Sequence, residues 1–430
     1  MPRIAPSERI EQELQGFLQK GMQTSEQPVS ELLRLAAQLV VQQALEQEVA
    51  DNLGRDRYAR RNEGQQGLRN GYEPGRIRSA EGEIRVQVPQ VRGLETPHRS
   101  KLMEFLRGNS DVLEYLVVQM YTRGLSTRDI EEAFRDPLSG EPLLGRTAVS
   151  ELTDSLWEEY QAFCQRDLSD FVVEYVFLDA IYESLRMQAG LKEALLVAWG
   201  ICRDGRKVLL HMALGNKESL SAWRAFLQDM LRRGLRVPTL VTTDGSPALI
   251  AAVEDVWPRS LRQRCLAHKK RNILDKLPDE AHQEVKRALN AVYDAPNREV
   301  ADLMAADLIE RYGKLYPSAV ACFQDDLEAC LAFLQCPASH HKRIRTTNLL
   351  ERAFLEERRR TNAIPRFFDE RSCLKLVFAT LWQASQRWQN VRMSHVERQQ
   401  LNHLRRQLKL DETEEMTEPI VKPEPVEIVA

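Results

Sequence analysis

The sequence has no apolar segment long enough to cross a bilayer. Its most notable apolar stretch, residues 194–202, is far shorter than the roughly 20 residues that a transmembrane helix needs. The first residues are polar and contain no apolar core of a secretory signal. Cysteine is also scarce: seven residues, an odd number without regular spacing, are typical of a reducing compartment. We therefore expect a cytoplasmic protein with no membrane partner.

Two common signatures of catalytic chemistry are absent as well. The chain has no Gly-rich loop of the P-loop type and no nucleophile elbow of the hydrolase type. The sequence therefore points to neither ATP nor a redox cofactor.

Negative charge is concentrated at one end of the chain. The net charge is −3, but residues 411–430 hold seven acids and one Lys, a net of −6, so the rest carries −3 − (−6) = +3. Their Pro, Glu and Thr content predicts a solvated tail that cannot bury a core. The remainder of the chain is better suited to a polyanionic partner than the total charge suggests.

The composition predicts a globular protein of two or three domains. Hydrophobic residues make up 43% and charged residues 29% of 430 residues. Residues 31–50 are expected to form a long helix that ends near Gly54. A basic loop is expected from Arg55 to Asn70-Gly71-Tyr72, and two alternating segments, 76–80 and 83–91, predict a hairpin with an Arg-rich outward face.

Residues 110–160 have helical periodicity. Helices are expected at 111–122, from Ser126 or Thr127 to Phe134, and at 147–163. Their order resembles a helix-turn-helix unit, although the turn is longer than usual. Plain helical packing explains the same pattern.

From about residue 170 the pattern changes to strands. Three aliphatic segments, with an Asp204-Gly205 turn between the last two, predict an antiparallel meander. An amphipathic helix, a strand at 239–243, a helix and a strand at 262–266 follow. This order matches an RNase H-like α/β core. The regions we assign are 1–109 (helical and hairpin), 110–169 (helix-turn-helix-like), 170–278 (core, first part), 279–340 (all-α insertion), 341–405 (final core helices) and 406–430 (acidic disordered tail).

Two aspartates are placed where they can share a metal ion. Asp179 lies where an apolar run meets polar residues, and Asp244 follows VTT and precedes Gly245. Adjacent strands are about 5 Å apart, so both carboxylates can reach one ion. Two carboxylates and a third ligand can hold a pair of Mg²⁺ ions, and oxygen-only ligation favours Mg²⁺ or Mn²⁺ over zinc. Either Asp alone is better explained as a turn former or ion-pair partner.

Glu351 is the candidate for the third ligand. Asn348-x-x-Glu351 also resembles a capping box, which makes a structural Glu a fair alternative. The surroundings are basic, which keeps a carboxylate ionised and suits substrate phosphates, although an exposed charged helix explains these residues almost as well. The basic residues are Lys342, Arg343, Arg345, Arg352, Arg358, Arg359 and Arg360.

Cys265 and His268 have the spacing of half a zinc site. No matching second pair lies nearby, so we do not expect zinc. Cys265 is expected to pack at a strand end. His268 heads the basic helix HKKRN and is expected to face the metal site or DNA.

Taken together, these motifs resemble those of the Mutator-type bacterial insertion-sequence transposases. LDAIYESLR, WGICRDGRKVLLHMALGNKES, VTTDG, QRCLAHKKRN and TTNLLER…RRRT occur in that family's order, and the resemblance covers about residues 30–400. It implies an RNase H-like core with a DDE triad, here Asp179, Asp244 and Glu351, with 351 − 244 = 107 residues between the last two. The family's Cys-x-x-His signature falls on Cys265 and His268.

The resemblance also implies a function. Such a protein binds the terminal inverted repeats of its own element, cleaves DNA with two Mg²⁺ ions and joins a 3′-OH to target DNA, and a homodimer on paired ends is expected. The chain departs from the family at Glu183, where a basic residue is common, and at FFDERS. Alternatives are a transposase-derived regulatory protein without catalysis and an RNase H-like nuclease. The candidate DNA contacts are His268, Lys269, Lys270, Arg271, Arg345, Arg358, Arg359 and Arg360.

Overall fold

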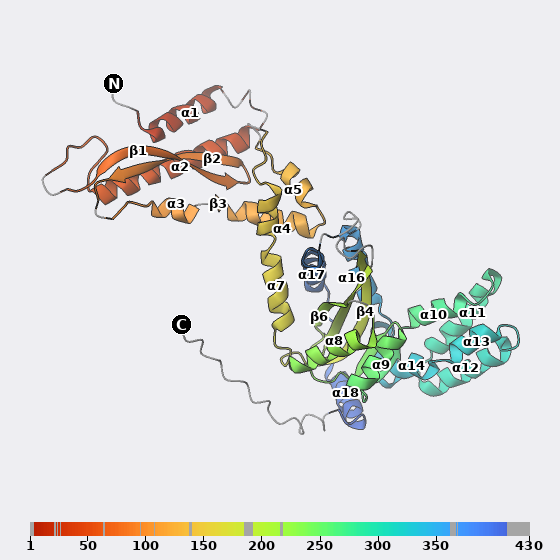
Figure 1. Ribbon diagram of the computed structural model, residues 1–430. Coiled ribbons are helices and arrows are strands. Elements are labelled where there is room, and N and C mark those ends of the chain that lie inside the picture. The colour runs from red at the N-terminus through yellow and green to blue at the C-terminus, as the bar shows by residue number, and fades with distance from the viewer. Residues whose placement is uncertain are drawn as a thin grey trace. The chain divides into compact units, whose positions relative to one another are not determined.

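The computed structural model describes residues 4–20, 23, 25, 27–62, 65–94, 96–106, 108–136, 140–184, 192–215, 218–361, 367 and 369–410. The chain divides into two compact units, residues 1–155 and 156–430 (Figure 1). The acidic segment 411–430, part of the 136–145 loop and part of FFDERS lie outside the described residues. Within the described ranges, none of the helices combines the length and apolarity that a bilayer span requires.

The first unit is built on a long helix and a hairpin. Its elements are α1 (Pro6–Lys20), α2 (Pro28–Leu53), β1 (Leu68–Ser79), β2 (Gly82–Arg92), α3 (Lys101–Leu106), β3 (Gly108–Asn109), α4 (Asp111–Thr122), α5 (Thr127–Ala133) and α6 (Arg146–Leu152). Leu45 of α2 packs on Ile77 and Val86 of the hairpin. Gly54 ends α2 in the left-handed conformation, as the sequence predicted.

The hairpin is confirmed but is longer than predicted. Ser79 pairs with Gly82 beside the turn, and the pairing continues to Leu68 and Arg92. The basic loop expected from Arg55 to Tyr72 therefore ends earlier than predicted, because β1 begins at Leu68 and includes Asn70-Gly71-Tyr72. A bulge between Arg69 and Tyr72 accommodates them in the ladder.

The helices at the end of the first unit follow the prediction with one correction. Ser126 and Asp129 form a reciprocal capping box that begins α5. The single helix expected at 147–163 is instead interrupted at Thr153-Asp154, which separates α6 from α7 (Ser155–Gln165). The structure thus contains α4, α5 and α6 in mutual contact, with a long connection before α6.

The second unit contains a five-stranded mixed sheet. Its elements before the all-helical part are β4 (Val173–Ser184), β5 (Lys192–Cys202), β6 (Lys207–Gly215), α8 (Leu220–Arg232), β7 (Leu240–Thr243), α9 (Pro247–Val256) and β8 (Leu261–Arg264). The strand order is β6-β5-β4-β7-β8. β4, β5 and β6 are antiparallel, whereas β7 is parallel to β4 and β8 is parallel to β7. The predicted meander and the two later strands are confirmed.

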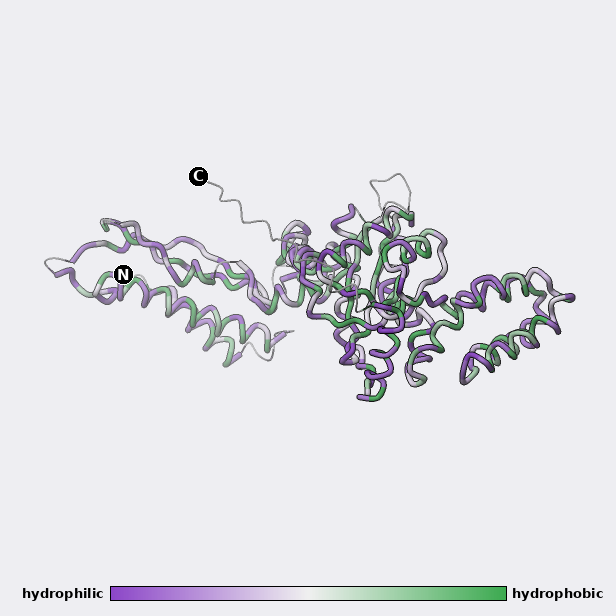
Figure 2. The backbone as a smooth tube through the Cα atoms, turned by 90° about the horizontal axis from the view of Figure 1, so that it is seen from below, coloured by the Kyte–Doolittle hydropathy of each residue, from purple (hydrophilic) through white to green (hydrophobic). Residues whose placement is uncertain are grey.

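Alternation along the strands explains how the sheet is covered. Val176 and Leu178 of β4 point to one face and pack with Trp223 of α8 and Leu249 of α9. Tyr175, which precedes Val176 and therefore points to the opposite face, shares a 2.7 Å hydrogen bond with His340. In Figure 2 the strands at the centre of this unit are predominantly hydrophobic, whereas hydrophilic residues alternate along its outer helices.

The regular elements that the structure describes after β8 are all helices or 3-10 turns. The elements are α10 (Leu266–Leu274), α11 (Asp279–Tyr293), α12 (Arg298–Tyr312), α13 (Pro317–Gln324), α14 (Leu327–Leu331), the 3-10 turns η2 (Ala332–Gln335) and η3 (Ala338–His340), α15 (His341–Ile344), α16 (Asn348–Thr361), α17 (Glu370–Gln386) and α18 (His395–Gln407). Helices α11 to α13 form a group beside the sheet, and α16 and α17 return to it (Figure 1).

Candidate functional site

Asp179 and Asp244 lie side by side where β7 ends. Leu178 of β4 pairs in parallel with Thr243 of β7, so the two aspartates occupy the next position on neighbouring strands. The apolar run ends at Asp179 but the strand does not, because β4 continues to Ser184. Asp179 is instead the point at which β4 loses its β7 neighbour. This change leaves the carboxylate half-buried at an open edge.

The two carboxylates influence each other electrostatically. Burial, and then the negative charge of Asp244, raises the pKa of Asp179 to about 7, and the backbone N–H of Ala180 partly opposes this by donating to its Oδ1 at 2.9 Å. Asp244 Oδ1 accepts from the N–H of Ser246 at 3.0 Å, just before α9 begins. A cation between the two carboxylates would relieve their repulsion.

Gly245 and Arg264 hold the Asp244 backbone. Gly245 has φ +94°, and a Cβ there would lie 0.7 Å from Nη1 of Arg264. The Arg264 guanidinium, on a side chain that is almost fully buried, donates to the carbonyl of Asp244. Sequence reasoning identified the need for Gly245 but missed Arg264, for which the glycine was the available signal.

Glu351 lies in the first turn of α16 beside His268 of α10. The Glu351 Oε1 atom is 4.0 Å from His268 Nε2. The pKa of His268 is raised, first by its hydrogen bond with Cys265, and also by the charges of Asp179 and Asp244, while burial opposes the change. His268 therefore lies within electrostatic reach of all three predicted ligands.

The donor chemistry of this site suits a hard divalent cation in part. Across the described ranges, no three side chains of His, Cys, Asp and Glu are close enough to hold a metal ion. Asp179 and Asp244 alone supply two adjacent carboxylates whose repulsion raises a pKa, which is the chemistry that Mg²⁺ or Mn²⁺ neutralises. Asp179 and Asp244 thus fit such an ion as two ligands. The carboxylate of Glu351 lies near His268 instead.

Several of the predicted DNA contacts are engaged within the protein. Lys269 is 2% exposed and its ammonium donates to the carbonyl of Asp325. Lys270 binds Asn290 Oδ1 at 2.5 Å. Arg345 binds the carboxylate of Asp294 at 2.8 Å. These three cations attach the α11–α14 region to α10 and to the end of α15.

The remaining predicted contacts lie on α10 and α16. Arg360 is paired with Glu356, and Arg359 makes a 2.6 Å ion pair with the same carboxylate while staying 74% exposed. Arg271 and Arg358 are exposed. These exposed guanidinium groups are placed where a polyanion can reach them.

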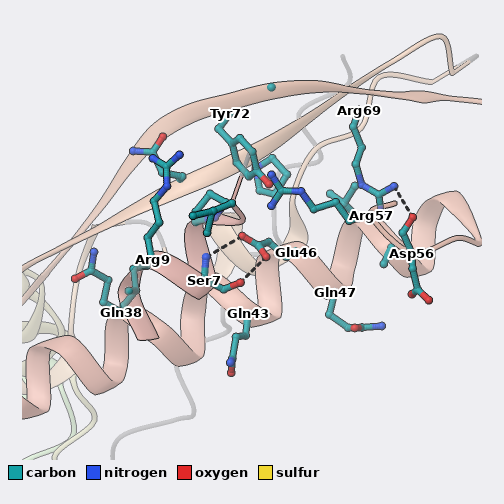
Figure 3. Close-up of a pocket in the computed structure, with 18 of the residues that line it drawn as sticks. Ser7, Arg9, Gln38, Gln43, Glu46, Gln47, Asp56, Arg57, Arg69 and Tyr72 are labelled. Carbon is teal, nitrogen blue, oxygen red and sulfur yellow. Dashed lines mark hydrogen bonds between the residues drawn. The ribbon is translucent and has the colours of Figure 1, made fainter. Parts of the chain in front are cut away.

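The first unit contains a cleft of about 1040 Å³ between α1, α2 and the hairpin. Ser7 donates to Glu46 at one wall, through its N–H at 3.2 Å and its hydroxyl at 2.7 Å (Figure 3). The Arg57 guanidinium lies 5.5 Å from the Tyr72 ring centroid. The arginines that line the cleft are Arg9, Arg57, Arg69 and Arg85.

The chain is similar in sequence to known transposases. The model of the Mutator family of transposases matches residues 9–391. The chain is 33% identical over 359 residues to the transposase for insertion sequence element ISRM5 of Rhizobium meliloti, which covers 83% of this chain and 88% of that protein. It is 32% identical over 355 residues to the transposase for IS406 of Burkholderia multivorans, with 82% and 90% covered. The chain therefore belongs to the Mutator family of transposases.

Proposed function

We propose that this protein is a DNA transposase of the DDE type, in which Asp179, Asp244 and Glu351 form the catalytic site. It binds the terminal inverted repeats of its own insertion sequence, cleaves a strand at each end and joins the freed 3′-OH to target DNA. The observation that carries the proposal is the pair of carboxylates on neighbouring parallel strands, where the charge of Asp244 helps to raise the pKa of Asp179.

The sheet supports an RNase H-like core. Three antiparallel strands are followed by two parallel strands on the β4 side, in the order β6-β5-β4-β7-β8. The two aspartates stand at the carboxyl end of the β7 pairing. The helical segment between β8 and α16 then acts as an all-α insertion, and α16 brings Glu351 back to the edge that carries the aspartates.

The proposed cofactor is Mg²⁺, with Mn²⁺ as a substitute. Held by these carboxylates, a pair of such ions supplies activation of the attacking oxygen and stabilisation of the leaving oxygen. The protein's own part is to orient the ligands. Arg264 fixes the Asp244 backbone, and the imidazole of His268 lies 4.0 Å from the Glu351 carboxylate.

DNA binding is assigned to both units. The exposed Arg271 and Arg358 are suited to grip phosphates next to the catalytic site, and the arginine-lined cleft of the first unit is suited to the terminal repeats. Two ends must be processed together, so we propose a homodimer in the bacterial cytoplasm. α2 offers a contact for it, because Val29, Leu33 and Val40 are exposed on this helix.

The test is strand transfer by the full-length protein on a DNA fragment that carries the ends of the element around its gene. Asp244→Asn is expected to abolish Mg²⁺-dependent cleavage and joining while binding to the ends persists. Asp255→Asn is the matched control, because Asp255 forms an exposed ion pair with Arg224. Full activity of Asp244→Asn would remove the proposed role of this carboxylate.

Two other functions have distinct outcomes in the same assay. A regulatory protein without catalysis would bind the ends and leave them uncut in Mg²⁺ and in Mn²⁺. A simple nuclease would cut them and never join the 3′-OH to new DNA.

A further inference from the structure

Cys265 connects two parts of the chain at the catalytic edge. It stands between β8 and α10, and its N–H donates to the carbonyl of Thr243 at 2.8 Å, one residue before Asp244. Its sulfur accepts two hydrogen bonds from Thr347, one from the N–H and one from the hydroxyl, both at 3.3 Å. Cys265 and Thr347 are both completely buried. The contacts are therefore made away from competing water.

The connection continues to Glu351. The carbonyl of Thr347 accepts from the N–H of Glu351 at 3.0 Å, in the first turn of α16. A short path of hydrogen bonds thus links Asp244 to Glu351 through Thr243, Cys265 and Thr347, although 107 residues separate the two acids in the chain.

Two neighbouring bonds hold the same segment. The hydroxyl of Thr242 donates to the carbonyl of Ile344 at 2.6 Å. The N–H of Leu266 donates to the carbonyl of Arg345 at 3.0 Å. These bonds hold residues 344–345, whereas the Cys265 sulfur holds Thr347, the residue whose carbonyl begins the turn with Glu351.

We infer that Cys265 is a positioning residue that holds Glu351 beside Asp244 by accepting the two hydrogen bonds of Thr347. This inference rests on the proposed function, because it assigns Cys265 a task only if Glu351 and Asp244 work together. The Cys-x-x-His pair then has two tasks at one site. Cys265 fixes the backbone of α16, and His268, one turn further along α10, lies against the side chain of Glu351.

The chemistry of sulfur explains why cysteine suits this position. Hydrogen bonds to sulfur are longer than the 2.7–3.2 Å typical of oxygen acceptors, so serine would have to draw α16 inward by several tenths of an ångström to keep both bonds. Alanine would leave the N–H and hydroxyl of Thr347 buried without this acceptor. Both changes act on Glu351 without touching its side chain.

The experiment measures Mn²⁺ binding to the full-length protein by calorimetry, without DNA, together with thermal unfolding. Cys265→Ala is expected to weaken Mn²⁺ binding by about tenfold, as loss of a residue that orients a ligand does. Thr347→Ser is expected to bind Mn²⁺ as tightly as the unmodified protein. The Mn²⁺ affinity of Thr347→Val is expected to lie between that of the unmodified protein and that of Cys265→Ala. Cys202→Ala is the matched control, because it removes a buried thiol from the apolar core cluster.

A double-variant comparison separates positioning from general stability. In a Glu351→Gln background, Cys265→Ala is expected to cause no further loss of Mn²⁺ affinity, because its effect passes through Glu351. Equal losses in both backgrounds, or an unchanged affinity in Cys265→Ala, would overturn the inference. If Cys265→Ala does not fold, the Mn²⁺ affinities of Thr347→Val and Thr347→Ser test the inference instead. Equal affinities of these two variants would overturn the inference.

Failure of the proposed function looks different. If Asp244→Asn leaves Mn²⁺ binding unchanged, the catalytic metal site itself is wrong, and the inference falls with it. If Asp244→Asn weakens binding and Cys265→Ala does not, only the inference is lost.

Discussion

Arg264 occupies the space that a side chain at residue 245 would need. The Nη1 atom of its guanidinium lies 0.7 Å from the position of a Cβ built on Gly245, and the same group donates to the carbonyl of Asp244. Gly245 is therefore required twice, for its left-handed φ of +94° and for the absence of a Cβ. The glycine and the arginine act together to hold the backbone of Asp244.

Gly245→Ala is expected to displace Arg264 and to abolish strand cleavage. The backbone strain alone costs about 1–3 kcal/mol in the free energy of unfolding. Gly234→Ala is the control, since Gly234 has φ +89° but its Cβ would meet its nearest neighbour at 3.0 Å. In urea unfolding, the two variants are expected to lose comparable stability. In the cleavage assay, Gly234→Ala is expected to retain cleavage and Gly245→Ala to lose it. Normal cleavage by Gly245→Ala would contradict the role of Arg264.

Glu357 is expected to make the protein less stable as pH rises. It is fully buried on α16, and burial first, then the carboxylate of Glu183, raises its pKa from 4.5 to about 8, while Thr361 and Arg358 oppose the change. Between these two pH values the folded protein holds a proton that the unfolded chain releases, so the free energy of unfolding falls as pH rises through this window. Glu357→Gln is expected to remove this slope and to stabilise the protein at pH 8 by about 1–3 kcal/mol.

The matched control for Glu357 lies one position earlier on α16. Glu356 is 43% exposed and pairs with Arg359 and Arg360, whose hydrogen bonds and charges lower its pKa. Glu356→Gln is expected to leave the slope between pH 5 and 8 in place. Urea unfolding at a series of pH values measures both variants, and an unchanged slope in Glu357→Gln would refute the raised pKa of Glu357 as its cause.

Substitutions of Lys269 and Arg358 are expected to have different effects: the first on stability and the second on DNA binding. Lys269→Gln removes a buried ammonium that binds Asp325, so the melting temperature should fall while the salt dependence of DNA binding stays the same. Arg358→Gln removes an exposed cation, so stability should stay the same while the slope of log affinity against log salt decreases by about 0.9. If Lys269→Gln instead keeps the melting temperature and decreases the salt slope, Lys269 contacts DNA.

Local patterns predicted most of the elements. The Asp204-Gly205 turn, the amphipathic α8 and the apolar runs of β4 and β6 depend on neighbours in sequence, and all were found as expected. Boundaries that depend on distant partners were less predictable. The bulge that lets β1 include Gly71 needs β2 opposite it, and the continuation of β4 beyond Asp179 needs β5.

Side-chain partners across the fold were the hardest to predict. The basic run at 268–271 has the same sequence signature whether its cations face DNA or protein, yet Lys269 and Lys270 turn toward the α11–α14 region. Thr347 and Arg264 lie within the motifs TTNLLER and QRCLAHKKRN, but these motifs do not indicate which distant groups the two side chains contact. Their importance appears only when residues far apart in the chain are brought together.

The sequence by itself determined the acids, the strands that carry two of them, and the glycine after Asp244, because spacing and local conformation are properties of the chain. Only the tertiary structure decided which groups hold those acids. Parallel pairing of β4 with β7 placed Asp179 next to Asp244, and the Cys265 sulfur tied Thr347 to the same edge. Both depend on contacts between segments whose separation no local pattern encodes.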